Sequence, residues 1–251
     1  MTSPASTGPL TSSGVVMSGL VVMDVRQSRL LSVVLLGVAA FTIALALPRF
    51  AAGLVAAPHV DTLADLGQAT GSSANAQARA MVAYDRALNW QDAPENHAAL
   101  GAFTLAAGMR ALRAGDAIAA REALTRSVAE HRAALVASPL DPYVWTRLLQ
   151  GGLALGAHAD EVAHHLRSAM ASAPWEPRLI TARLGLAFAL WEDLDEDIRR
   201  ALGPQILHAA RLYPASLARQ ARLHRAQEQV LQALESEPDM LRRFSLAYSR
   251  F

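Results

Sequence analysis

The strongest constraint on the fold is an uncharged apolar stretch near the N-terminus. From Leu30 to Leu47 there is no charged side chain, and only Ser32 and Thr42 are mildly polar. An α-helix rises about 1.5 Å per residue, so this stretch would extend roughly 27 Å, close to the hydrocarbon thickness of a bilayer. A helix in a soluble core rarely stays apolar on every face for so long. The sequence therefore predicts one membrane-spanning helix that contacts the lipid bilayer.

The residues around this helix set the expected domain organisation. Pro48 and Arg49 end the uncharged stretch, but apolar residues continue beyond them. The preceding segment is rich in Ser, Thr, Gly and Pro, which predicts disorder. A later cluster of Gly, Ser and Thr predicts a linker. The expected domains are a disordered cytoplasmic segment (1–29), the transmembrane helix or uncleaved signal anchor with its extension (30–57), a linker (58–73) and a helical-repeat domain (74–251).

The arginines beside the apolar stretch predict its orientation. Arg26 and Arg29 precede it and Arg49 follows it, so the positive-inside rule favours a cytoplasmic N-terminus and an exported C-terminal domain. We therefore expect a single-pass protein of the bacterial inner membrane with a periplasmic domain. Ala44 and Ala46 also match the small-x-small pattern of signal cleavage, although the stretch is longer than the about 7–15 residues of most signal sequences. Cleavage after Ala46 stays open as an alternative.

The composition excludes several classes of function. A formal charge of +1 argues against a nucleic-acid binder, because phosphate neutralisation needs a marked basic surplus. The absence of Cys excludes disulfides, thiolate catalysis and Cys-ligated zinc. All 23 basic residues are Arg. We expect neither a cofactor nor a nucleic-acid partner, and a small-molecule ligand is not expected either.

The motifs of common enzymes and metal sites are missing from the sequence. The acidic run 192–197 lacks the Gly that a calcium loop needs for its turn. His158, His164 and His165 do not form the His-Glu-x-x-His pattern that places two imidazoles on zinc. The sequence has neither a phosphate-binding loop after a strand nor a Gly-x-Ser-x-Gly elbow. We therefore predict no catalytic residue and no metal site.

From Ala74 onward the residue pattern predicts helices and no strand. Acidic residues at Asp116, Asp141 and Glu176 stand where helices are expected to begin, and the last two precede proline. Such acids accept hydrogen bonds from free N–H groups, and proline at the first helical position has no N–H to lose. The predicted helices are 74–90, 95–113, 116–137, 142–156, 159–172, 177–191, 195–212, 215–235 and 238–249.

An internal repeat organises these helices. Residues 138–146 (SPLDPYVWT) return at an offset of 35 as residues 173–181 (APWEPRLIT), with both prolines, the acid and the Thr in place. Repeats of about 34 residues that end in Pro are typical of stacked helical hairpins. Trp145 and Leu148 match the first-helix Trp and Leu of the tetratricopeptide family, although Leu149 replaces the Gly that follows. The chain thus resembles a degenerate tetratricopeptide protein, which implies an all-α solenoid of stacked hairpins.

The resemblance implies a protein-binding concave surface. Positions that face ligands in the family correspond here to Tyr143, Thr146, Gln150, Arg178 and Thr181. The alternative is that Tyr143 and Arg178 are ordinary, partly exposed helix residues. The residues between them are assigned to the core: Trp145, Leu148, Leu149, Ile180 and Leu184.

Three arginines form a second candidate surface. Arg219, Arg222 and Arg225 recur every third residue, so they would lie near one helical face. Guanidinium groups suit phosphate, and this face would bind anionic lipid headgroups or a phosphorylated carrier. The alternative is a solvated stripe without a ligand.

The sequence favours a scaffold rather than an enzyme. We expect a membrane-anchored protein that organises partner proteins in an envelope assembly. The Pro-x-Asp-Pro-Tyr-x-Trp run is similar to runs in helical-repeat modules of surface-polysaccharide synthesis and export. The alternatives are an accessory subunit of protein maturation, similar to those of cytochrome c biogenesis, and an envelope hydrolase, whose catalytic residues we do not find.

Overall fold

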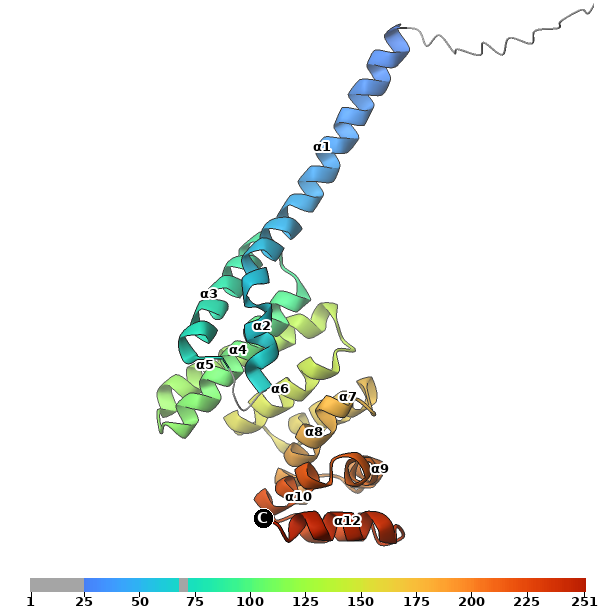
Figure 1. Cartoon of the computed structure of the whole chain (residues 1–251). Coiled ribbons are helices and arrows are strands. Elements are labelled where there is room, and N and C mark those ends of the chain that lie inside the picture. The colour runs from blue at the N-terminus through green and yellow to red at the C-terminus, as the bar shows by residue number, and fades with distance from the viewer. Residues whose placement is uncertain (1–24, 68–71) are drawn as a thin grey trace, which may run out of the picture. The chain divides into compact units, whose positions relative to one another are not determined.

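The protein is helical throughout the part of the chain that the structure describes. The computed structural model describes residues 25–67 and 72–251, with side chains from Leu31 onward. These residues contain no strand, which confirms the predicted all-α class (Figure 1). The disorder predicted for residues 1–24 lies outside the described residues. The chain divides into two compact units, residues 1–46 and 47–251, which we describe separately.

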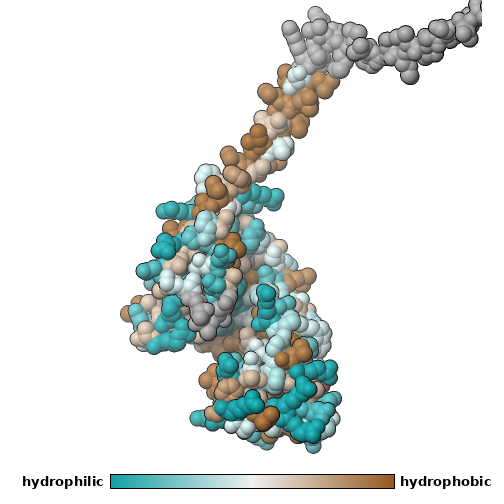
Figure 2. Space-filling view, in the orientation of Figure 1, coloured by the Kyte–Doolittle hydropathy of each residue, from teal (hydrophilic) through white to brown (hydrophobic). Residues whose placement is uncertain are grey.

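The first unit contains most of a single long helix. Helix α1 spans Val25–Ala56, so residues 25–29, which we expected to be disordered, are helical. Its apolar side chains up to Leu47 are almost all exposed, as the brown surface in Figure 2 shows. The helix is therefore long and apolar enough to span a membrane. Pro48, which ends the uncharged stretch, lies inside α1, and the helix continues into the second unit.

The second unit begins with the last turns of α1. Ala52 and Ala56 are buried there against Tyr84 and Phe103. The predicted linker (58–73) is partly helical. Three short elements follow α1: η1 (Ala57–His59), α2 (Val60–Ala64) and η2 (Asp65–Gly67). Leu63 and Leu66 pack against the same apolar cluster, which explains why this segment is folded onto the domain.

The helices of the second unit then follow in close agreement with the predicted ranges. They are α3 (Ala74–Trp90), α4 (Pro94–Arg113), α5 (Ala117–Ala137), α6 (Pro142–Leu155), α7 (Ala159–Ser172), α8 (Pro177–Ala189), η3 (Trp191–Asp193), α9 (Glu196–Leu212), α10 (Pro214–Leu223), α11 (Gln227–Ala233) and α12 (Pro238–Tyr248). Their starts follow local rules. The side chain of Asp141 accepts hydrogen bonds from the backbone N–H groups of Tyr143 and Val144 at 2.9 and 3.1 Å, as its cap position predicted.

Alternate helices of this unit share a proline start and contact one another in succession. Proline is the first residue of α4, α6, α8, α10 and α12. In this series each helix contacts the next one, and α4, α5, α6 and α7 also pack in chain order (Figure 1). The buried apolar residues fall into separate clusters. The first cluster contains buried residues from Ala52 to Phe103 in sequence, the second from Ala134 to Leu148, and the largest from Leu149 to Ala247.

One predicted helix is wrong. The sequence predicted a continuous helix over 215–235, but the chain breaks between α10 and α11. Arg225 lies in this break with φ of 55°, a left-handed conformation that non-glycine residues seldom adopt. The N–H of Ala226 donates to the carbonyl oxygen of Ala221 at 2.8 Å, and this bond closes the end of α10. Neither Gly nor Pro marks the break in the sequence.

Candidate binding site

An arginine-lined cavity is the candidate site. It has a volume of about 630 Å³ and is lined by residues of η2, α3, α4 and α6 and by Ser72. Its charged and amide side chains are those of Asp65, Gln77, Arg110, Arg113, Arg147 and Gln150. Apolar residues such as Leu105 and Met109 form the rest of the wall. A cavity of this size with a few polar groups suits a peptide side chain or a small ligand.

Arg110 is fixed at the wall of the cavity by α3. Its Nη1 donates a hydrogen bond to Oε1 of Gln77. Gln77 is itself buried, and its Nε2 donates to the backbone carbonyl oxygen of Ser72 at 3.0 Å. The guanidinium group of Arg110 therefore has a defined position before any ligand binds. Such preorganisation reduces the entropy that a ligand must offset.

Arg147 contributes a charge for which the described part of the chain offers no acceptor. It lies in α6, half-buried, one turn before Gln150. Burial lowers the pKa of Arg147, an effect that the charge of Asp141 partly offsets. Among the described residues, the Arg147 guanidinium has neither a hydrogen-bond acceptor nor an ion pair. A desolvated cation of this kind is stabilised by an anion that enters the cavity.

The charges around the cavity are unbalanced. The guanidinium groups of Arg110, Arg113 and Arg147 face one carboxylate, that of Asp65, so the lining carries a net charge of +2. Within the described ranges, none of these arginines forms an ion pair with a carboxylate. Guanidinium groups bind carboxylates and phosphates through paired N–H donors. The cavity is therefore suited to an anionic group.

The predicted concave-surface residues have different positions in the structure. Gln150 lines the cavity, beside Arg147. Thr146 is only 5% exposed and donates from its hydroxyl group to the carbonyl oxygen of Pro142 at 2.7 Å. The expectation that Thr146 is available to a partner is therefore corrected, because its side chain is turned back onto its own helix. The assigned core residues Leu148, Leu149, Ile180 and Leu184 are buried, whereas Trp145 is half-buried.

Tyr143 connects α6 to the start of α8. Its hydroxyl group donates to Oε1 of Glu176, the cap residue of α8, at 2.9 Å. Arg178 is exposed at the start of α8, and Thr181 is half-buried one turn later. These three residues are absent from the lining of the arginine cavity. The structure thus brings Gln150 alone of the predicted set into the candidate site.

The second predicted surface is interrupted. Arg219 and Arg222 lie on α10, whereas Arg225 lies beyond its end and so does not continue the helical face. The guanidinium of Arg219 lies 5.7 Å from the ring centroid of Phe251, and that of Arg222 lies 5.6 Å from the ring centroid of Tyr248. Both arginines therefore have cation–π partners near the C-terminus. Their role with anionic lipid stays a prediction.

The sequence alone did not distinguish the arginines of the cavity from the others. Arg110 and Arg113 are three residues apart on α4, but Arg147 lies on another helix and no motif relates it to them. Comparison of the chain with known protein families, with curated proteins and with solved structures finds no match. The functional argument therefore depends on the residues and their positions.

Proposed function

We propose that this chain is a single-pass inner-membrane scaffold whose exported helical domain binds an acidic segment of a partner protein in the arginine-lined cavity. The observation that carries the proposal is the net positive charge of that cavity, which includes Arg147, a guanidinium with no acceptor among the described residues. The long apolar α1 supports the membrane anchor. The proline-started helices that contact one another in series support a tetratricopeptide-like solenoid.

The orientation and the pathway belong to the same proposal. We place the second unit in the periplasm because of the arginines on either side of the apolar stretch. A reporter enzyme fused after Phe251 that is active only in the cytosol would overturn this placement. For the pathway, we propose an assembly that makes or exports surface polysaccharide. A partner found by crosslinking and known to act in that process would support this choice, and a partner from haem handling would refute it.

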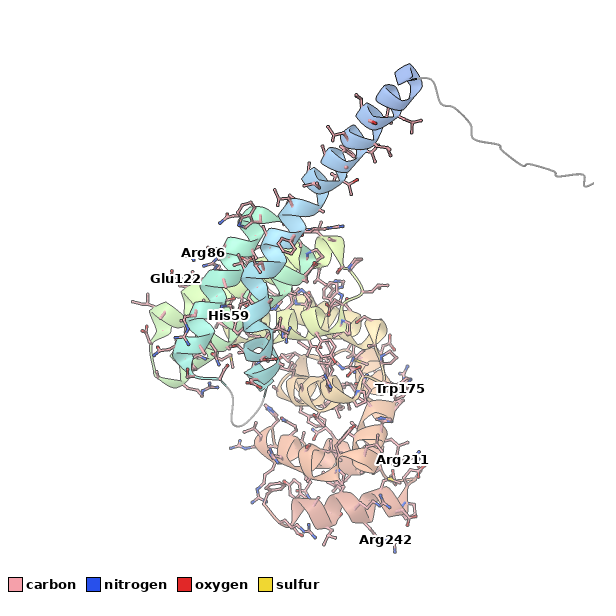
Figure 3. All side chains as sticks on the ribbon, turned by 45° about the horizontal axis from the view of Figure 1, so that its top comes forward. His59, Arg86, Glu122, Trp175, Arg211 and Arg242 are labelled. Carbon is pink, nitrogen blue, oxygen red and sulfur yellow. The ribbon has the colours of Figure 1, made fainter. Side chains whose placement is uncertain are left out.

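A direct binding measurement tests the cavity. The full chain in detergent micelles is titrated with a fluorescent oligoglutamate peptide, and Arg147→Gln is compared with wild type. A charge-assisted hydrogen bond contributes about 1.5–3 kcal/mol, so we expect a loss of about tenfold or more in affinity. Arg242→Gln is the matched control, because Arg242 is an exposed arginine of α12 (Figure 3). Equal affinity of all three proteins would refute the proposed site.

Crosslinking in native membranes identifies the partner itself. Because the chain has no lysine, amine-reactive reagents can reach only its N-terminal amino group. A photo-crosslinking residue at position 150, in the cavity, avoids this obstacle. The same residue at position 242 serves as the control. The proposal requires an adduct at position 150 that Arg147→Gln removes and that is absent at position 242.

A further inference from the structure

The first residues of the second unit lie beside the turn between α3 and α4. A cavity of about 530 Å³ is lined on one side by Arg49, Ala52 and Gly53 of α1, and on the other by Gln91 of the turn and Asn96 of α4. This turn is far from α1 in sequence, yet it lines the same cavity as Arg49. Arg49 is the second residue after the apolar stretch.

Large apolar side chains are exposed at this level of the domain. Phe50 and Leu54 of α1 are 69% and 66% exposed, and Trp90, which immediately precedes Gln91, is 54% exposed. These exposed side chains come from two separate segments of the chain. Large apolar side chains that are exposed together mark surfaces that contact a protein or a membrane.

The depth of these residues follows from helix geometry. If the apolar stretch spans the bilayer up to Leu47, Phe50 lies about 5 Å and Leu54 about 10 Å further along the helix. The polar headgroup layer on each side of the hydrocarbon core is roughly 5–8 Å thick. Phe50 therefore lies within the headgroup layer, and the turn beside Arg49 lies next to it. Tryptophan is the residue most typical of this layer.

We infer that the α3–α4 turn rests on the membrane, with the indole of Trp90 among the lipid headgroups at the level of Phe50. The inference depends on the proposed membrane anchor. The occupant of this surface is the bilayer, because Phe50 follows the apolar stretch of α1 by three residues and the α3–α4 turn lines the same cavity as Arg49. The exported domain is then docked against the membrane by two points of contact.

The charges of the surface exclude an electrostatic attachment. Arg49 is accompanied by Asp92 and Glu95, so the surface lacks the basic surplus that attracts anionic lipids. The contact with the membrane is therefore due to the insertion of apolar side chains among the lipids. We therefore expect the contact of Trp90 with lipid to persist at high salt.

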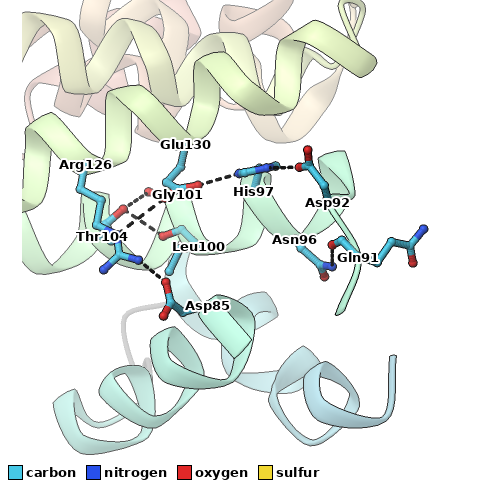
Figure 4. Close-up of polar contacts among 10 residues, drawn as sticks. All are labelled: Asp85, Gln91, Asp92, Asn96, His97, Leu100, Gly101, Thr104, Arg126 and Glu130. Atoms are coloured by element: carbon cyan, nitrogen blue, oxygen red, sulfur yellow. Dashed lines mark hydrogen bonds and ion pairs between the residues drawn. The ribbon is translucent and has the colours of Figure 1, made fainter. Parts of the chain in front are cut away.

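The turn that follows Trp90 is connected to the rest of the domain by a histidine. His97 of α4 lies between two carboxylates, with Nε2 at 2.6 Å from Oδ1 of Asp92 and Nδ1 at 2.6 Å from Oε2 of Glu130 (Figure 4). Asp92 belongs to the turn, whereas Glu130 belongs to α5. The imidazole therefore ties the turn to two helices of the domain.

Tryptophan fluorescence tests this inference in the intact chain. The protein is reconstituted into phosphatidylglycerol–phosphatidylcholine vesicles whose acyl chains are brominated near the headgroup, since bromine quenches nearby indole. Two variants keep a single tryptophan, either Trp90 or Trp175, and have Phe at the other three positions. Trp175 is the matched control, because it is also 54% exposed and lies at the outer edge of the domain (Figure 3). We expect a loss of Trp90 emission and no loss of Trp175 emission.

A second measurement uses variants with a single substitution, in case the variants with three substitutions do not fold. Trp90→Phe and Trp175→Phe are made singly in the otherwise native chain, and only Trp90→Phe is expected to remove the quenched part of the emission. Flotation of the vesicles separates the inference from the anchor on which it depends. Protein that floats but leaves Trp90 unquenched, or quenched to the same extent as Trp175, refutes the docked turn alone. Protein that fails to float refutes the anchor and the docked turn together.

Discussion

Arg183 donates a hydrogen bond from Nη1 to the backbone carbonyl oxygen of Ala173 at 2.8 Å, although Arg183 is fully buried. A second bond reaches the carbonyl oxygen of Ala169 at 2.5 Å. Ala173 is the cap residue at the end of α7, where helix carbonyls have no partner within the helix. The guanidinium of Arg183 in α8 thus donates to free carbonyl groups at the C-terminal end of α7. It also places a positive charge at the negative end of the α7 helix dipole.

Replacing this arginine should destabilise the domain. Arg183→Met keeps much of the side-chain volume but leaves the carbonyl groups of α7 buried without donors. Each buried unsatisfied group costs about 1–3 kcal/mol, so we expect the free energy of unfolding to fall by roughly 3 kcal/mol. Urea unfolding monitored by circular dichroism measures the change. Arg200→Met, at an exposed position, should change stability by no more than about 0.5 kcal/mol. Equal effects of the two substitutions would contradict the capping role.

Two glycines should respond to alanine with opposite signs. At Gly101 a Cβ atom would lie 2.9 Å from the ring of the buried His131, so Gly101→Ala should cost about 1–3 kcal/mol. At Gly53, in α1, a Cβ atom would meet nothing within 4 Å, and Gly53→Ala should stabilise the helix by about 0.5–1 kcal/mol. Thermal unfolding of both variants in the same detergent compares them. A lower melting temperature for Gly53→Ala would contradict this prediction.

Acid should weaken the fold through His131. Burial lowers the pKa of His131 to about 3, whereas an unfolded histidine has a pKa of about 6.5. The unfolded chain then binds the proton more tightly, so this contribution to stability is complete above pH 6.5 and is lost as the pH falls toward 3. Its slope is at most about 1.4 kcal/mol per pH unit. Denaturant unfolding between pH 7 and 4 should show a shallower slope for His131→Leu than for wild type. Parallel slopes would exclude His131 as the cause.

His97 should titrate in the opposite direction. Burial opposes its charge, but hydrogen bonds to Glu130 and Asp92 and their negative charges raise the pKa of His97. Its contribution to stability is therefore present below the unfolded pKa and is lost as the pH rises through the folded one. In NMR titrations Asp92→Asn should lower the pKa of His97. Asp239→Asn, which changes an exposed ion pair of α12, should leave it unchanged. An unaltered His97 titration in Asp92→Asn would show that the pair does not form.

Local rules explain why much of the helical pattern could be predicted. Asp141 and Glu176 accept hydrogen bonds from the first N–H groups of α6 and α8, and proline follows each acid. These signals act within a few residues, so they can be recognised without the tertiary structure. Pro48 shows their limit. It carries the same signal for a helix boundary, yet α1 continues through it to the buried Ala52 and Ala56.

The candidate site could not be predicted because it depends on distant parts of the chain. Arg147 of α6, Arg110 of α4 and Gln77 of α3 meet at one cavity, although nothing in their sequence spacing relates them. The buried Arg183 looks like any other arginine in the sequence until its carbonyl acceptors are seen. The helix break at Arg225 could not be predicted either, because arginine is not a residue type that favours the left-handed conformation.

The division of the apolar core into separate clusters has a mechanical consequence. One cluster contains buried residues from Leu149 to Ala247 in sequence, and another contains residues from Ala52 to Phe103. Proteins open locally in contiguous units, and separate apolar clusters are natural boundaries for such units. We therefore expect a force applied at Phe251 to unfold the C-terminal helices first, while the cluster that packs on the last turns of α1 stays folded.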